Sequence, residues 1–196
     1  MTTSSRAAMI FAVVLTFVLR ASHGRAAVST PADFIRTSCK ETLYPELCEK
    51  SLSVYAPTVR SPRLLARAAI SLTAKRATAA SNFVRSMSAQ RGKRLSVATD
   101  RGSVHDCLET LAESIDGLQR SAREVDLMGR YGSQSFRWHL GNAQTWVSAA
   151  LTDVNTCLDG LAQDRSAALI RPLIAQQVVR VSRLTSNALA LLNRLQ

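Results

Sequence analysis

One short stretch of this sequence combines residue types that could do nucleophilic and acid–base chemistry. Ser103, His105 and Asp106 are the residue types of a hydrolytic triad. Neighbours one or two positions apart on a helix do not face each other, so this spacing does not build a proton relay. We interpret His105 as a solvated helix residue. The sequence also contains no Gly-x-Ser-x-Gly, His-Glu-x-x-His, phosphate-loop or dinucleotide-binding motif.

Three acidic residues follow at helical spacing, Glu109, Glu113 and Asp116. A pair of carboxylates could share general acid and base roles, but the same pattern is typical of a wet helix face. Beyond residue 26 the histidines are His105 and His139, and no cysteine pair has zinc-finger spacing. We therefore expect no metal site, no cofactor and no enzyme activity.

Four cysteines remain for structural chemistry: Cys39, Cys48, Cys107 and Cys157. An even number of cysteines behind a secretory signal implies disulfides, and four cysteines allow three connectivities. The first two lie close together and the last two lie on long helical patterns. This arrangement favours Cys39 with Cys48 and Cys107 with Cys157.

Residues 1–26 have the pattern of a secretory signal peptide. Arg6 precedes an apolar run of eleven residues, Met9 to Leu19, and small residues follow it. Such a run is too short to cross a bilayer core of about 30 Å, and no longer one follows, so we expect no membrane association after cleavage. Residues 27–196 then form one domain. Removal of the signal segment takes away three basic residues and lowers the net charge from +11 to +8. This positive charge predicts attraction to a polyanion. In a secreted protein, we expect that polyanion to be an acidic polysaccharide or protein rather than nucleic acid.

The elements that carry these residues are helices. Residues 31–56 read as a short helical hairpin, broken at Tyr44-Pro45. Four long helices are expected after it. The first is capped by Ser61 and followed by a turn at 90–94, and the second has a capping box at Ser103. The last starts near Arg171, with Ser166 as its cap. Apolar or small residues recur at alternating steps of three and four, which is the spacing of a buried helix face. The expected stripes are Ala66, Ile70, Thr73, Ala77, Ala80, Val84 and Met87; Val104, Leu108, Leu111, Ile115, Leu118, Ala122 and Val125; Leu140, Ala143, Val147, Ala150, Val154, Cys157 and Leu161; and Ile170, Ile174, Gln177, Val181, Leu184, Ala188 and Leu191.

This pattern predicts an all-α fold, an antiparallel up-down-up-down four-helix bundle with an N-terminal helical hairpin and two disulfides. Four segments resemble the plant invertase and pectin methylesterase inhibitor family: Thr37–Leu52, Asp106–Glu109, Trp146–Asp159 and Thr185–Leu191. The resemblance implies the same bundle, and it implies disulfides from the first cysteine to the second and from the third to the fourth. It also implies a secreted, non-catalytic protein of the apoplast or cell wall that binds a carbohydrate-processing enzyme. Leu111, where the family often has tyrosine, and Gly102 depart from its pattern.

The resemblance favours pectin methylesterase as the target. Invertase inhibitors of the family carry a Pro-Lys-Phe segment where this chain has residues 133–137, Ser-Gln-Ser-Phe-Arg. The alternatives are an inhibitor of cell-wall or vacuolar acid invertase and a basic wall-associated bundle with no enzyme target; weak association with acidic pectin is a further expectation. Because no catalytic domain follows residue 196, we expect a free inhibitor rather than the pro-region of an esterase.

By resemblance, the inhibitor covers the substrate cleft of the esterase in a one-to-one complex, using the outer faces of its later helices. The predicted contact residues are polar side chains off the core stripes of the second and third long helices. They are Glu109, Glu113, Asp116, Arg120, Gln134, Arg137, Gln144, Ser148 and Thr152.

Overall fold

The computed structural model describes residues 30–94, 102–165 and 167–196, and the expected signal segment lies outside these ranges. All secondary structure in the described residues is helical. A hairpin of α2 (Pro31–Cys39), α3 (Pro45–Leu52) and the 3-10 turn η1 (Ser53–Tyr55) comes first. Four long helices follow: α4 (Pro62–Arg94), α5 (Ser103–Leu127), α6 (Gln134–Gln163) and α7 (Arg171–Asn193). None of the described helices is long and apolar enough to cross a membrane.

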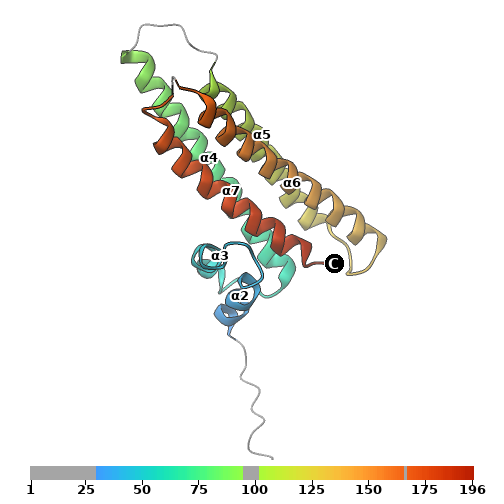
Figure 1. Cartoon of the computed structure of the whole chain (residues 1–196). Coiled ribbons are helices and arrows are strands. Elements are labelled where there is room, and N and C mark those ends of the chain that lie inside the picture. The colour runs from blue at the N-terminus through green and yellow to red at the C-terminus, as the bar shows by residue number, and fades with distance from the viewer. Residues whose placement is uncertain (1–29, 95–101, 166) are drawn as a thin grey trace, which may run out of the picture. The chain divides into compact units, whose positions relative to one another are not determined.

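The long helices form a bundle in which each helix has two neighbours. α4 packs on α5 and α7, and α6 packs on the same two helices (Figure 1). The contacts between α5 and α6 show that the two helices run in opposite directions. The start of α5 meets the end of α6 through Ser103 and Asp164, and the later part of α5 meets the beginning of α6 through Glu124 and His139. The two helices are therefore antiparallel. The all-α prediction is confirmed, and in Figure 1 the helices alternate in direction.

Two long helices begin with a serine cap; the cap at Ser61 was expected and the one at Ser133 was not. The hydroxyl of Ser61 accepts a hydrogen bond from the backbone N–H of Leu64 at 3.3 Å, and Pro62 takes the first helical position, where it loses no intrahelical bond. Ser133 caps α6 in the same way, by accepting from the N–H of Phe136 at 3.1 Å. Both caps satisfy donors that the first helical turn leaves unpaired.

Other expected ends were wrong. Gly102, not Ser103, is the N-cap of α5, and no side chain caps that helix. Ser103 instead donates to Asp164 Oδ2 at 2.7 Å, which ties the start of α5 to the end of α6. Residues 90–94, expected as a turn, continue α4, because Gly92 is tolerated inside a long helix at a modest cost. α7 starts at Arg171 as expected, while the predicted cap Ser166 lies outside the described residues.

The stripes on α6 and α4 bury as predicted: all seven positions on α6 are buried, as are six of seven on α4, with Met87 half-buried. On α5 the buried face is rotated from the prediction. Val104, Leu108 and Ile115 are only partly buried, while Cys107 and three small residues, Ser114, Gly117 and Ser121, are buried instead. The small residues were overlooked because they are not apolar, yet they allow α5 and α6 to approach closely. On α7, Gln177 is exposed and Val178 replaces it in the core.

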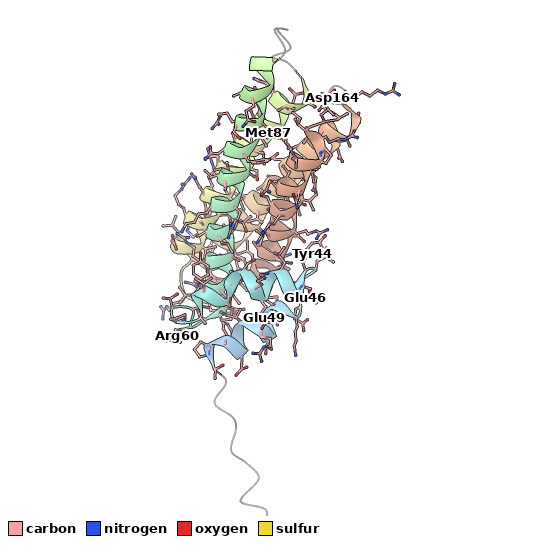
Figure 2. The ribbon with its side chains drawn as sticks, turned by 90° about the vertical axis from the view of Figure 1, so that its left-hand side faces the viewer. Tyr44, Glu46, Glu49, Arg60, Met87 and Asp164 are labelled. Carbon is pink, nitrogen blue, oxygen red and sulfur yellow. A yellow bond between two sulfur atoms is a disulfide. The ribbon has the colours of Figure 1, made fainter. Side chains whose placement is uncertain are left out.

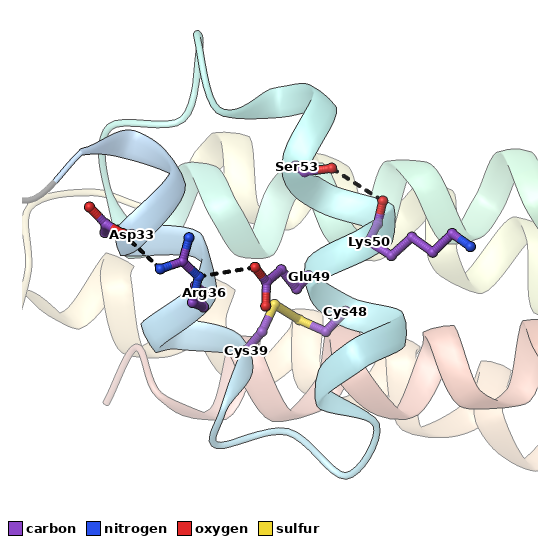
Figure 3. Close-up of polar contacts among 7 residues, drawn as sticks. All are labelled: Asp33, Arg36, Cys39, Cys48, Glu49, Lys50 and Ser53. Atoms are coloured by element: carbon purple, nitrogen blue, oxygen red, sulfur yellow. Dashed lines mark hydrogen bonds and ion pairs between the residues drawn. A yellow bond between two sulfur atoms is a disulfide. The ribbon is translucent and has the colours of Figure 1, made fainter.

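The hairpin is stapled internally and anchored to the bundle. Cys39 and Cys48 form the expected disulfide, with Cα atoms 5.5 Å apart. Beside it, Arg36 pairs with Asp33 at 3.0 Å and with Glu49 at 3.1 Å (Figure 3). Two short helices of this length would not hold themselves in water, so the covalent staple substitutes for a core of their own.

One residue of the last helix fixes the hairpin on the bundle. Asn187 of α7 accepts from the backbone N–H of Tyr44 at 3.0 Å and donates to its carbonyl at 2.9 Å. Figure 2 shows Tyr44 where the hairpin meets this part of the bundle. The amide of Asn187 is buried and satisfied by both groups, so it sets the register of hairpin against helix.

Candidate target-binding surface

The α5–α6 pair provides the most closely joined surface of the bundle. The disulfide between Cys107 and Cys157 brings their Cα atoms to 4.2 Å. Towards the other end of the pair, Ser121 donates from its buried hydroxyl to the carbonyl of Ala143 at 2.9 Å. A Cβ atom on Gly117 would lie only 3.1 Å from the carbonyl oxygen of Trp146, so glycine permits this approach. The side chains on the outer edge of this pair are therefore held on a rigid support.

The four predicted contact residues of α5 lie together on that edge. Glu109, Glu113, Asp116 and Arg120 are spaced by four, three and four positions, and all are exposed. Arg120 pairs with Asp116 at 2.6 Å, and its guanidinium lies 4.9 Å from the ring centroid of Trp146 on α6. The pair orients a planar cation over a half-buried indole, an arrangement that favours both partners electrostatically.

Two acidic groups also influence each other electrostatically across the edge. Asp153 of α6 is half-buried near Glu113 of α5. Burial raises the pKa of the Asp153 carboxyl above its ordinary value of 3.8, and the negative charge of Glu113 raises it further. The local potential here is negative and changes as this carboxyl takes up a proton.

The other end of the edge carries a third cluster. Nδ1 of His139 lies 2.6 Å from Oε2 of Glu124, and the side-chain amide of Asn142 donates to the same oxygen at 3.4 Å. The side chains of His139 and Glu124 are mostly buried, with 22% and 21% of their surface exposed. Of the two tryptophans, Trp138 is exposed and Trp146 forms part of the edge.

The predicted contact residues of α6 do not join this edge. Gln144 donates to Asn193 of α7 at 3.0 Å, and so it lies on the side of α6 that faces α7. Ser148 and Thr152 follow at steps of four, turning from that side towards solvent. Gln134 and Arg137 are exposed near the start of α6, where Arg137 donates to the carbonyl of Gly132 at 2.6 Å. Whether these five residues contact a target stays a prediction.

The residues that sequence reasoning missed form a row of their own. His139, Asn142, Trp146, Ala149 and Asp153 recur at steps of three and four, one position from the core stripe, and so they line the α5 side of α6. That spacing is visible in the sequence. What the sequence lacks is the identity of the helix that the row faces.

The one group of side chains in the described residues close enough to share a metal ion is His105, Asp106 and Glu109. All three are exposed on a single helix, and Nδ1 of His105 lies 3.8 Å from Glu109. An exposed group of this kind is common on wet helix faces and carries no chemistry by itself.

The chain is similar to known proteins over nearly its whole length. The model of the plant invertase/pectin methylesterase inhibitor family matches residues 33–191. A 21 kDa protein of Daucus carota is 38% identical over 191 residues, which cover 96% of this chain and 94% of the relative. Pectinesterase inhibitor 9 of Arabidopsis thaliana is 37% identical, over 94% of this chain and 92% of the relative. Pectinesterase inhibitor 10 of the same plant is 45% identical over 84% of this chain, which spans about half of that relative (51%).

Solved structures give the same fold. The crystal structure of a mutant form of a pectin methylesterase inhibitor from Arabidopsis superimposes with a TM-score of 0.60. The match covers 81% of this chain and 95% of the other, at 21% sequence identity. The arrangement of helices is thus shared by chains that have few residues in common.

Proposed function

Because the chain belongs to the plant invertase/pectin methylesterase inhibitor family, we propose that it inhibits pectin methylesterase by occupying the enzyme's substrate cleft in a one-to-one complex. The family consists of proteinaceous inhibitors, so the chain is not itself an enzyme. The observation that carries the proposal is the similarity over nearly the whole chain to a relative named pectinesterase inhibitor. The expected signal segment would deliver the protein to the cell wall.

The α5–α6 edge is the surface that we assign to the target. It presents an exposed arginine stacked on a tryptophan, Arg120 and Trp146, at the centre of a polar row. Arginine and tryptophan are among the residue types that most often carry binding energy at protein interfaces. The helices beneath are joined covalently and by the Ser121 hydrogen bond, so binding does not require this surface to be ordered first.

Inhibition on this surface needs no bond to be made or broken. A rigid helix pair seated in the cleft excludes the polysaccharide sterically, while Glu113, Asp116 and Arg120 pair with polar groups of the enzyme. Complementary charges raise the rate of encounter and reject wrong partners more than they raise affinity. We therefore expect inhibition to weaken as salt screens these pairs.

The first test is an assay of the purified mature protein against two enzymes. Pectin methylesterase turnover should fall to its minimum at one equivalent of inhibitor, and acid invertase should be unaffected. Inhibition of invertase alone would assign the chain to the other target of its family, and inhibition of neither would leave the proposal without support.

The second test locates the surface. Glu113→Lys together with Asp116→Lys should weaken inhibition of the esterase by tenfold or more, about 1.4 kcal/mol, since two charges on the edge are reversed. Glu41→Lys with Glu46→Lys on the hairpin is the matched control, because it changes the net charge equally at exposed positions. Circular dichroism must show that both proteins fold. Equal inhibition by the two variants would place the contact surface elsewhere.

A further inference from the structure

The charges of the bundle are divided between its two sides. α4 contains eight basic residues and α7 three, and neither helix contains an acidic residue. α5 contains six acidic and two basic residues, and α6 two acidic and one basic. α4 and α7 lie side by side (Figure 1), so the positive charge of the domain is concentrated on the side away from the α5–α6 edge.

The geometry shows which side chains of α4 turn towards α7. Arg67 pairs with Asp126 of α5 at 2.8 Å, which fixes the side of α4 that faces α5. Arg76 lies nine positions later, about 180° further around the helix at 100° per residue, and so it faces away from α5, towards α7. Lys75 stands next to it on the outer surface, and both side chains are exposed.

The same argument applies to α7. Ser182 donates to Asn155 of α6 at 2.9 Å, which fixes the side of α7 that faces α6. Arg180 is two positions earlier, about 200° around the helix, and so it turns towards α4. Arg183 is exposed too, with its guanidinium 5.3 Å from the ring centroid of Tyr44 in the hairpin. We call Lys75, Arg76, Arg180 and Arg183 the basic face.

No acidic side chain pairs with the basic face in the described part of the chain. Some exposed arginines elsewhere do have acidic partners: Arg36 pairs with Asp33 and Glu49, and Arg120 with Asp116. Four unpaired cations on two adjacent helices produce a positive potential that attracts a polyanion from solution. Three of the four are arginines, whose planar guanidinium binds carboxylates in a bidentate manner.

We propose that the basic face binds a polyuronate, the de-esterified form of pectin, in which successive sugars carry carboxylates. The charges come from two helices that run alongside each other, an arrangement that fits a linear polyanion better than a small anion. The choice of this polymer rests on the proposed function, because hydrolysis of pectin methyl esters leaves carboxylates on the polysaccharide. The basic face and the α5–α6 edge lie on different sides of the bundle, so one protein can hold the polymer and the enzyme together.

The proposal is tested by measuring binding of the mature protein to polygalacturonate and to highly methyl-esterified pectin. Wild type should bind the first at low salt, release it as salt is raised, and bind the second at least about tenfold more weakly, because esterified sugars carry no charge. Arg76→Glu with Arg180→Glu should weaken binding to polygalacturonate about tenfold, as expected when exposed ion pairs of modest strength are lost and replaced by repulsion.

A matched control separates this surface from net charge. Arg123→Glu with Arg130→Glu makes the same change in net charge at exposed positions outside the basic face, and it should retain most of the binding. Equal loss in both variants, or equal binding of esterified pectin by wild type, would overturn the proposal. Circular dichroism must show that both variants fold, and if Arg76→Glu with Arg180→Glu does not, Lys75→Gln with Arg180→Gln replaces it.

Esterase inhibition distinguishes this proposal from the proposed function. Arg76→Glu with Arg180→Glu should inhibit the enzyme on a soluble substrate as well as wild type, whereas Glu113→Lys with Asp116→Lys should bind polygalacturonate at least as well as wild type. Loss of polygalacturonate binding together with loss of inhibition in the same variant would show that one surface serves both partners, and it would refute the separate basic face.

Discussion

Two buried serines on α5 offer a matched pair of substitutions that tests how α5 and α6 are held together. Ser114 and Ser121 are both fully buried, with 0% of their surface exposed, and they lie two turns apart on the same face. Ser121 donates its hydroxyl proton to Ala143 at 2.9 Å. The hydroxyl of Ser114 has no hydrogen-bond partner among the described residues. Replacing each serine with alanine removes the same atom from two different environments.

The expected effects have opposite signs. Ser121→Ala removes a buried hydrogen bond and should cost about 1 kcal/mol of unfolding free energy. Ser114→Ala removes a buried hydroxyl whose desolvation is not compensated by a hydrogen bond, and so it should raise the unfolding free energy by about 1 kcal/mol. The two variants should therefore differ by about 2 kcal/mol, which corresponds to roughly 4–8 °C in Tm for a domain of this size.

Thermal and denaturant unfolding, followed by circular dichroism on both variants and wild type, measures this difference. Inhibition of the esterase well below Tm should be unchanged in both, because neither serine reaches the surface. Equal stabilities of the two variants, or the reverse order, would show that the Ser121 bond does not hold α5 against α6.

Three further changes test the same helix pair. Asp153→Asn should stabilise the protein at neutral pH, because burial and Glu113 raise the pKa of the carboxyl, so its ionisation disfavours the folded state. The gain in stability should vanish as the pH falls below the ordinary pKa of 3.8, where the carboxyl is protonated in both the folded and the unfolded state. Unfolding free energies measured across this pH range check the prediction. Gly117→Ala should lower Tm, because its Cβ would lie 3.1 Å from the carbonyl oxygen of Trp146, whereas Gly141→Ala in open space should add about 0.5–1 kcal/mol to stability; equal Tm changes would contradict the close approach. Replacing both cysteines of the α5–α6 disulfide with serine should lower the free energy of unfolding by about 4 kcal/mol in the chain-entropy model. Denaturant unfolding under oxidising conditions measures this loss, and an unchanged free energy of unfolding would contradict the prediction.

The core of the bundle was the part that the sequence could predict. On α6 the buried positions are apolar or small and recur at regular steps, so periodicity identified all of them except Phe136 in the first turn. α5 shows where that reasoning fails: Ser114, Gly117 and Ser121 are polar or lack a side chain, and a search for apolar residues passes over them. They are buried because α6 lies close enough to exclude water, which depends on the packing of two helices rather than on the preference of one.

The sequence predicts which residues lie on the polar flanks of each helix, but it does not predict which neighbouring helix each flank faces. The reason is the topology of the bundle. A stripe pattern tells which face of a helix is buried, but each polar flank beside it can face either of two neighbours. An up-down bundle can turn to the left or to the right with the same stripes, and reversing the turn would exchange the neighbours of every flank. Arg67 with Asp126 and Ser182 with Asn155 select one hand.

That selection decides which charged residues meet. With this hand, Glu113 and Arg120 of α5 face Asp153 and Trp146 of α6, and Gln144 turns instead to α7. With the opposite hand, the acidic flank of α5 would lie beside α4, whose arginines would neutralise it, and the positive and negative sides of the bundle would merge. The separation of an acidic edge from a basic face therefore depends on the hand of the bundle. The same four helices, with every residue unchanged, would not have separate acidic and basic sides in a bundle of the opposite hand.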